Sequence, residues 1–285
     1  MKKRNQERII TVEKIEAFAL HLQEQEKSAA TISKYTHDLN ALRGALLGQK
    51  LTKEALISWK ENLSAQYAAA SVNSMLAALN SFLDFYGWSG LKVKPLKIHR
   101  EIFCREEKEL TRAEYIRLVQ AAEHEGNERL SLMLQTICAT GIRVSELQYI
   151  TVAAVRCGRG EVNNKGKQRM VFLPGKLCGL LKKYLQKRKI TDGAVFITRN
   201  GKPIDRSNIW REMKLLCAIA GITPEKVFPH NLRHLFARTY YSIEKDLSRL
   251  ADILGHCNIN TTRIYTIESG WMHERQIARM GLVIT

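Results

Sequence analysis

The sequence contains no apolar run near the ~20 residues that a membrane-spanning helix requires. Its opening residues, MKKRNQER, are basic, but polar and periodic sequence follows them where a signal peptide would have its apolar core. Lipidation motifs are also missing. We therefore expect a protein that stays in the cytosol and has no membrane partner.

Acidic residues are scarce relative to basic ones. The 285 residues include 28 Asp and Glu against 45 Lys and Arg, which gives a formal net charge of +17. Such an excess says little about the fold but predicts a polyanionic partner. With no membrane signal present, nucleic acid is the first candidate.

Paired cysteines are absent as well, because the sequence has no CxxC motif. Six cysteines at wide intervals do not have the spacing of a zinc site, so we expect free thiols in a reducing compartment and neither a metal nor another cofactor. The alternative is that Cys257, beside His256, acts as a ligand pair or a redox-sensitive thiol, but no third ligand is in view. The cysteines are Cys104, Cys138, Cys157, Cys178, Cys217 and Cys257.

Alternation of the kind seen in strands is lacking from Thr11 to about Trp88. Apolar residues recur there at helical spacing, as in Ile15, Phe18 and Leu22. We predict a compact helical bundle in residues 1–88. Its helices are expected at residues 11–25, 29–47, 52–66 and 69–86.

An irregular stretch with Gly, Pro and basic residues predicts a linker over residues 89–107, and a second domain over residues 108–285. The expected fold class is mainly α with a small antiparallel β-sheet. Gly-marked turns and short alternation place the sheet between Val152 and Leu173, with another short strand at AVFIT. The expected helices reach Glu123 and then cover residues 128–139, 175–188 and 207–220, the last with Ser207 as a plausible N-cap.

Polar residues that could surround one small anion gather in two stretches, ATGIRVSEL and the segment from Pro229 to Thr266. His230 and Arg233 are three apart and would share a helix face. Tyr265 follows His256 after a short polar loop, and Asn260, Thr261 or Thr262 could cap a new helix that places Tyr265 near its start. Arg143 adds a second guanidinium just past a Gly-marked helix end.

The chemistry of this set is that of phosphoryl transfer. A phenol has a pKa of about 10 and becomes a nucleophile when cations stabilise its phenolate. Arginine matches the oxygens of a phosphoryl group, so Arg beside Tyr indicates attack on a phosphodiester. Glu146 is expected to be a structural partner of Arg143 or its loop, since a negative charge facing the phosphate would oppose the reaction.

The boxes ATGIRVSEL, HNLRH, LGH and the final Tyr, in this order and with family-like gaps, resemble the tyrosine site-specific recombinases of the phage integrase family. The resemblance covers nearly the whole chain. It implies a two-domain DNA clamp, with a helical core-binding (SAM-like) domain in residues 1–88 and a catalytic domain in residues 108–285. The tail, residues 270–285, would dock on a neighbouring protomer of a homo-tetramer assembled on paired sites of double-stranded DNA. Docking of the tail into its own domain is the alternative.

The same resemblance implies roles for individual residues. Tyr265 would be the nucleophile that forms a 3′-phosphotyrosyl intermediate on the way to a Holliday junction, without metal or ATP. Arg143, Arg233 and His256 would stabilise the transition state, and His230 would act as acid/base or as a further donor.

A hairpin lysine would be the general acid. Lys165 matches the family position best, and Lys167 is a competitor because the hairpin looks a residue shorter than in many relatives. His234 is expected to support the core, and Tyr240 and Tyr241, within the same helix as Arg233, to be core residues and not nucleophiles.

Other basic and polar residues are candidate DNA contacts, although each could equally belong to a solvated surface. The candidates are Lys27, Thr31, Lys34, Lys94, Lys97, Arg100, Lys167, Arg169, Ser207, Asn208 and Arg211.

Two other functions are open to the same residues: a type IB topoisomerase and a non-catalytic DNA-binding regulator. The helical bundle and the recombinase boxes favour a recombinase over both. The expected role is integration or excision of a mobile element, with a DNA-bending or excisionase protein as a possible accessory factor, and chromosome-dimer resolution is the alternative.

Overall fold

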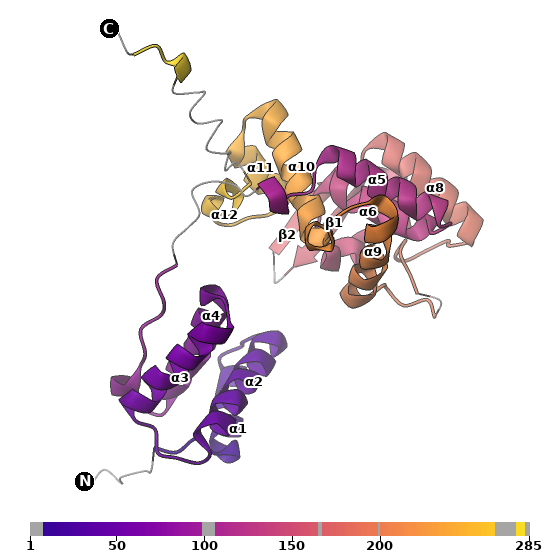
Figure 1. Cartoon of the computed structure of the whole chain (residues 1–285). Coiled ribbons are helices and arrows are strands. Elements are labelled where there is room, and N and C mark those ends of the chain that lie inside the picture. The colour runs from indigo at the N-terminus through magenta and orange to yellow at the C-terminus, as the bar shows by residue number, and fades with distance from the viewer. Residues whose placement is uncertain (1–7, 99–105, 165–166, 199, 266–277, 283–285) are drawn as a thin grey trace. The chain divides into compact units, whose positions relative to one another are not determined.

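The computed structural model describes residues 8–98, 106–164, 167–198, 200–265 and 278–282 (Figure 1). The chain folds as two compact units, Met1–Arg100 and Glu101–Thr285. Both units are mostly helical, and the sheet is one two-stranded antiparallel hairpin. The predicted fold class is therefore confirmed.

The N-terminal unit is a bundle whose helices lie within one residue of the predicted bounds at each end. Three of them begin where the side chain of Thr11, Ser28 or Thr52 accepts a hydrogen bond from a backbone N–H of the first turn. Its elements are α1 (Val12–Glu24), α2 (Ala29–Leu46), α3 (Lys53–Gln66), α4 (Ala69–Phe85) and the 3-10 helix η1 (Ser89–Leu91).

The segment after η1 also belongs to this unit. The Asn80 side chain bonds to both the N–H and the C=O of Val93, at 3.0 Å each. Asn73 does the same for Leu96, at 2.7 and 2.9 Å. Because Leu91 and Val93 are buried in the bundle core, the linker expected from residue 89 starts only after Leu96.

The C-terminal unit is built around one central helix. Its elements are η2 (Glu106–Lys108), α5 (Arg112–His124), α6 (Glu128–Thr140), η3 (Val144–Tyr149), α7 (Val152–Cys157), β1 (Arg159–Asn164), β2 (Lys167–Phe172), α8 (Gly175–Arg188), α9 (Arg206–Ala220), η4 (Pro224–Lys226), α10 (Pro229–Glu244), α11 (Leu247–Leu254) and α12 (Ile259–Arg263).

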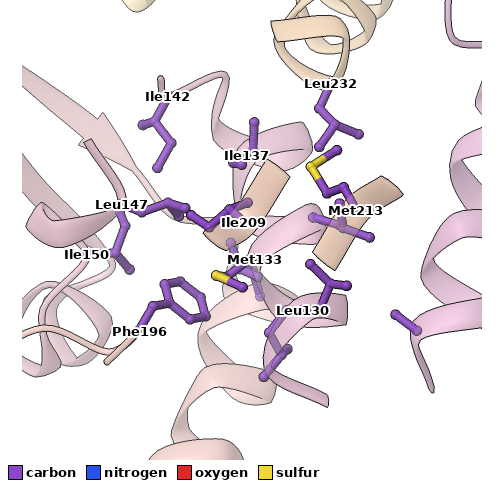
Figure 2. Close-up of a cluster of buried hydrophobic side chains, with 14 of the residues drawn as sticks. Leu130, Met133, Ile137, Ile142, Leu147, Ile150, Phe196, Ile209, Met213 and Leu232 are labelled. Atoms are coloured by element: carbon purple, nitrogen blue, oxygen red, sulfur yellow. The ribbon is translucent and has the colours of Figure 1, made fainter. Parts of the chain in front are cut away.

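Helix α6 is apolar nearly all round and packs against α5, α8, α9 and α10. Figure 2 shows its side chains, among them Met133 and Ile137, together with residues such as Leu147, Phe196 and Leu232 from other elements. Burial around most of its circumference fixes α6 in place. The loop that follows its last residue is thereby fixed as well.

The region predicted as sheet differs from expectation in its first six residues, which form α7. Thr151 caps this helix by accepting from the Ala154 N–H at 3.1 Å, and Gly158 ends it with φ 71°. Val152 and Val155, three apart, are both buried. The Thr151 cap, the glycine that ends the helix and the helical spacing of the two valines therefore favour a helix here over the strand that the short alternation predicted.

Two smaller expectations were wrong. Helix α9 is capped by Asp205, not Ser207, because the Asp205 carboxylate accepts from the Ser207 N–H at 3.0 Å. The AVFIT segment makes isolated bridges, Thr151 with Ala194 and Ile197 with Pro203, and does not form the short strand that was expected.

Candidate active site

Arg233 is the most enclosed charged group of the site. It lies in the second turn of α10, is 1% exposed, and is among the largest fully buried side chains of the described residues. Its Nη1 donates to the carbonyl of Gly141, and its Nη2 donates to that of Leu254 at 2.7 Å. One guanidinium therefore joins the carboxyl ends of α6 and α11.

Burial, followed by the charge of Arg143, lowers the pKa of Arg233 to about 10. The group is still charged at neutral pH. Its Nε atom is buried and has no hydrogen-bond partner among the described atoms. A buried donor without an acceptor calls for an explanation, and a bound anion would supply one.

His256 follows α11 and is oriented from both sides. Its Nε2 lies 2.9 Å from Arg233 Nη2, and its Nδ1 lies 2.9 Å from the hydroxyl of the buried Thr262. A guanidinium only donates, so Nε2 accepts and Nδ1 carries the proton that is donated to Thr262. Burial and the charges of Arg233 and Arg143 lower the pKa of His256 to about 4, which keeps the imidazole neutral at pH 7.

Arg143 lies three residues after the end of α6, which the left-handed Gly141 (φ 65°) terminates. Its backbone N–H and its Nη1 both donate to Glu146, at 2.8 and 3.0 Å. Glu146 is 1% exposed and also binds Arg169, so it is a structural partner, as expected. The Arg143 side chain is 35% exposed and so remains accessible to a ligand.

Tyr265 lies two residues beyond the end of α12, not near the start of a helix as expected, because Asn258 caps that helix earlier. Its ring stacks on His256 with centroids 5.8 Å apart and an interplanar angle of 24°. It meets His234 edge-on at 4.7 Å and lies 6.4 Å from the ring of His230. The residue is only 3% exposed.

His230 is exposed near the start of α10, and its ring lies 4.6 Å from that of His234. Desolvation of the ring, then the charges of His234, Arg233 and Arg143, lower the pKa of His230 to about 4. His234 pairs with Glu109 at 3.2 Å, so it supports the Tyr265 ring from within the fold.

Glu109 was not found from the sequence. Burial alone would raise its pKa, but the hydrogen bond and charge of His234 and the charge of Arg238 outweigh that effect and lower it. Its carboxylate also lies 3.4 Å from Arg238 Nη2. A single acidic residue ahead of the Thr111 helix cap carries no signal of this role.

A pocket opens beside these groups. Its lining includes Arg143, His230 and Arg233, together with Arg206 and Trp210 of α9. Trp210 is 49% exposed and was also missed. The sequence does carry a signal for Trp210. It follows the buried Ile209 and therefore lies off the apolar face of α9, where a large exposed aromatic residue indicates a binding site.

Of the two hairpin lysines, the structure describes only the backbone of Lys167. Strand β1 pairs with β2 in a register that ends at Asn164 opposite Lys167. Lys165 lies outside the described residues, as does the side chain of Lys167. The assignment of the general acid stays a prediction.

The candidate DNA contacts of the N-terminal unit are mostly exposed. Lys27 precedes the N-cap of α2, and Lys34, in the second turn of that helix, forms an ion pair with the buried Asp38. Lys94 and Lys97 are exposed beyond η1. Thr31, in the first turn of α2, is partly buried, and Arg100 lies outside the described residues.

The candidates on α9 face solvent to different degrees: Ser207 and Arg211 are exposed, and Asn208 is partly buried. Arg169 is used differently from what was expected. Its side chain is 12% exposed, and its guanidinium is bonded to the buried Glu146.

Comparison with known proteins agrees with this arrangement. The model of the phage integrase family matches residues 108–269, and that of the phage integrase N-terminal SAM-like domain matches residues 15–90. The chain belongs to the phage integrase family of tyrosine recombinases. Members of this family cleave and rejoin DNA, so the chain is a DNA-processing enzyme.

Similar proteins include tyrosine recombinase XerD of Proteus mirabilis, 32% identical over 85% of this chain and 84% of that protein. Tyrosine recombinase XerC of Roseiflexus castenholzii is 30% identical over 89% and 88%. Among solved structures, a lambda integrase tetramer bound to a Holliday junction has a TM-score of 0.72 at 17% identity, over 92% of this chain and 78% of that one. The XerH recombinase in a post-cleavage complex with its difH substrate has a TM-score of 0.69 at 19% identity, over 87% and 79%.

In the part of the chain that the structure describes, no helix is both long and apolar enough to cross a membrane.

Proposed function

We propose that this recombinase cleaves DNA by attack of the Tyr265 hydroxyl on a scissile phosphate. The observation that carries the proposal is the buried, unpartnered Nε of Arg233 in a site where Arg143 is half open and Tyr265 stacks on His256. One buried donor without an acceptor and a second guanidinium that is 35% exposed lie together with an aromatic hydroxyl. This is an arrangement for an anion and a nucleophile.

In the proposed step the bond from Tyr265 Oη to phosphorus forms as the bond from phosphorus to the 5′ oxygen breaks. Arg143, Arg233 and His256 stabilise the pentavalent transition state, and the proton of the Tyr265 hydroxyl passes to His230 acting as the base, or to water where His230 is only a further donor. Lys165 gives a proton to the leaving 5′ oxygen. The products are a 3′-phosphotyrosyl protein and a free 5′ hydroxyl, and attack by a 5′ hydroxyl of the partner duplex reverses the bond changes.

Because the phosphotyrosyl bond conserves the energy of the phosphodiester, we propose that exchange needs neither metal nor ATP. Tyr265 is buried in the free protein, so DNA binding must make its hydroxyl accessible. We further propose that four copies act on paired sites through a Holliday junction, and that the tail after Ser269 joins neighbouring copies.

As a biological role we propose integration or excision of a mobile element. The similarity to XerD and XerC over most of the chain supports the alternative, chromosome-dimer resolution. The DNA flanking the gene separates the two, because inverted repeats, an adjacent excisionase or a conjugative module would accompany a mobile element.

The decisive experiment uses Tyr265→Phe, which removes one oxygen and keeps the ring. Wild-type protein in EDTA with a nicked suicide site should give a denaturant-resistant adduct, because loss of the short 5′ fragment prevents resealing. Tyr265→Phe should bind the site with similar affinity and give no adduct, since packing and net charge are unchanged.

The controls are Tyr240→Phe and Tyr241→Phe, in the same apolar cluster as Tyr265. Both should still form the adduct. An adduct in Tyr265→Phe would assign the nucleophile elsewhere, and complete dependence of wild-type cleavage on magnesium would overturn the mechanism.

A further inference from the structure

Arg169 of β2 makes a two-pronged contact with a buried acid. Its Nη1 and Nη2 donate to the two carboxylate oxygens of Glu146 at 2.9 and 2.7 Å. The neighbouring Met170 is 45% exposed, so the pleat of β2 directs the Arg169 side chain inward. A planar guanidinium fits this geometry, whereas an ammonium group does not.

The same side chain also holds the turn after α11. Arg169 Nε donates to the carbonyl of Ile253 at 3.3 Å. A Cβ at Gly255 would lie 2.6 Å from Arg169 Cδ and 3.2 Å from its Nε. Gly255 has φ 66°, so this position needs glycine both for its backbone and for the arginine that lies over it.

Both ends of this contact lead to residues of the proposed active site. Glu146 accepts from the backbone N–H and Nη1 of Arg143. The Gly255 turn leads directly into His256, whose Nε2 contacts Arg233. Arg169 is thus bonded to the supports of two phosphate-binding groups while it is itself nearly enclosed.

We propose that Arg169 is a positioning residue for DNA cleavage, which fixes Arg143 through Glu146 and fixes His256 through the Gly255 turn. The inference rests on the proposed function of the site. It explains the glycine of the LGH motif, because a side chain at Gly255 would clash with Arg169. It also links the hairpin that carries the lysine candidates to the residues that hold the phosphate.

The test compares Arg169→Met and Arg169→Lys with Arg159→Met, which removes the charge of an exposed arginine on the other strand of the hairpin. DNA affinity is measured over a range of salt, and the rate of adduct formation is measured at saturating DNA. Both Arg169 variants should form the adduct about ten- to a hundredfold more slowly, as expected for displaced catalytic groups. Their salt dependence of binding should equal that of the wild type, because no phosphate contact is lost.

Substrate chemistry separates this role from that of the hairpin lysine. A 5′-bridging phosphorothiolate needs no general acid, so it should leave the rate deficit of Arg169→Met in place. Rescue by that substrate would show that Arg169 acts through the lysine and would overturn the proposal. A wild-type rate at saturating DNA, or a salt slope reduced by about one, would make Arg169 a plain DNA contact and overturn it as well.

Gly255→Ala tests the second arm of the contact. Its Cβ meets the Arg169 side chain, so it should slow adduct formation. The left-handed backbone strain at residue 255 remains after Arg169 is replaced, so Arg169→Met with Gly255→Ala should lose less than the product of the two single losses. Losses that multiply would refute the link through the turn. Thermal melting of each variant distinguishes unfolding from misplacement. If wild-type protein forms no adduct, the proposed function fails together with the inference, whereas a wild-type adduct with unaffected Arg169 variants contradicts the inference alone.

Discussion

Replacing Gly141 by alanine should damage the fold and the site together. Gly141 ends α6 with φ 65°, and a Cβ there would lie 2.4 and 2.7 Å from two ring carbons of Phe236 and 3.1 Å from Leu254 Cδ2. Its carbonyl accepts the hydrogen bond from Arg233 Nη1. A backbone shift at Gly141 that relieves the clash would therefore move an acceptor of the buried guanidinium.

The magnitude follows from comparison with Gly221→Ala. Gly221 ends α9 with φ 61°, and a Cβ there would meet nothing within 4 Å. Both variants bear the cost of a left-handed alanine, about 1–2 kcal/mol, less the gain from a stiffer unfolded chain, about 0.4–1 kcal/mol. Only Gly141→Ala adds overpacking, about 1–3 kcal/mol. The free energies of unfolding should therefore differ by about 1–3 kcal/mol.

Urea denaturation of the full chain, followed by far-UV circular dichroism, measures this difference. Adduct formation at saturating DNA should fall about tenfold or more in Gly141→Ala and stay at the wild-type rate in Gly221→Ala. Equal stability of the two variants would mean that Phe236 and Leu254 give way without cost. That result would refute the argument that a rigid α6 terminus holds Arg233.

Three further results are expected. In the folded protein the pKa of His230 and that of His256 are each lowered from 6.5 to about 4. Between these two pH values the unfolded chain therefore binds more protons than the folded protein does. The melting temperature should accordingly fall as the pH is lowered from 6.5 to 4, and it should fall less steeply in His256→Gln. Lys165→Ala should slow cleavage of a normal substrate and be rescued by a 5′-bridging phosphorothiolate; rescue of Lys167→Ala instead would move the general acid by two residues. Removal of the residues after Ser269 should reduce synapsis and recombination more than single-site binding, and unchanged recombination would refute a tail that joins copies.

The helices were predictable because periodicity and caps agree. In the N-terminal unit Ser28 and Thr52 mark helix starts, and apolar residues at helical spacing follow each of them. The predicted bounds are correct within a residue there. The prediction was wrong at α7, which was expected to be part of the sheet. The six residues between Thr151 and Gly158 are too few to show a helical period that could be told from the alternation of a strand.

The candidate site was predictable as a set of residues but not as a geometry. Arginine, histidine and tyrosine in motif order indicated an anion and a nucleophile. The sequence could not indicate that His256 accepts from Arg233 and donates to Thr262, because those contacts depend on how α11 and α12 pack. The burial of Tyr265 likewise follows from tertiary packing against Leu250 and Leu254.

Arg169 shows why basic residues are the hardest to interpret from sequence in a DNA-binding protein. In a chain of charge +17, an arginine in a lysine-rich hairpin looks like one more phosphate contact. Two distant features assign it otherwise: a buried Glu146 that needs compensation, and a left-handed Gly255 that leaves room for its side chain. Neither is adjacent to Arg169 in sequence. Glu146 comes three residues after Arg143, and Gly255 immediately precedes His256. The 45 basic residues of this chain therefore include at least one arginine that is paired with an acid inside the fold.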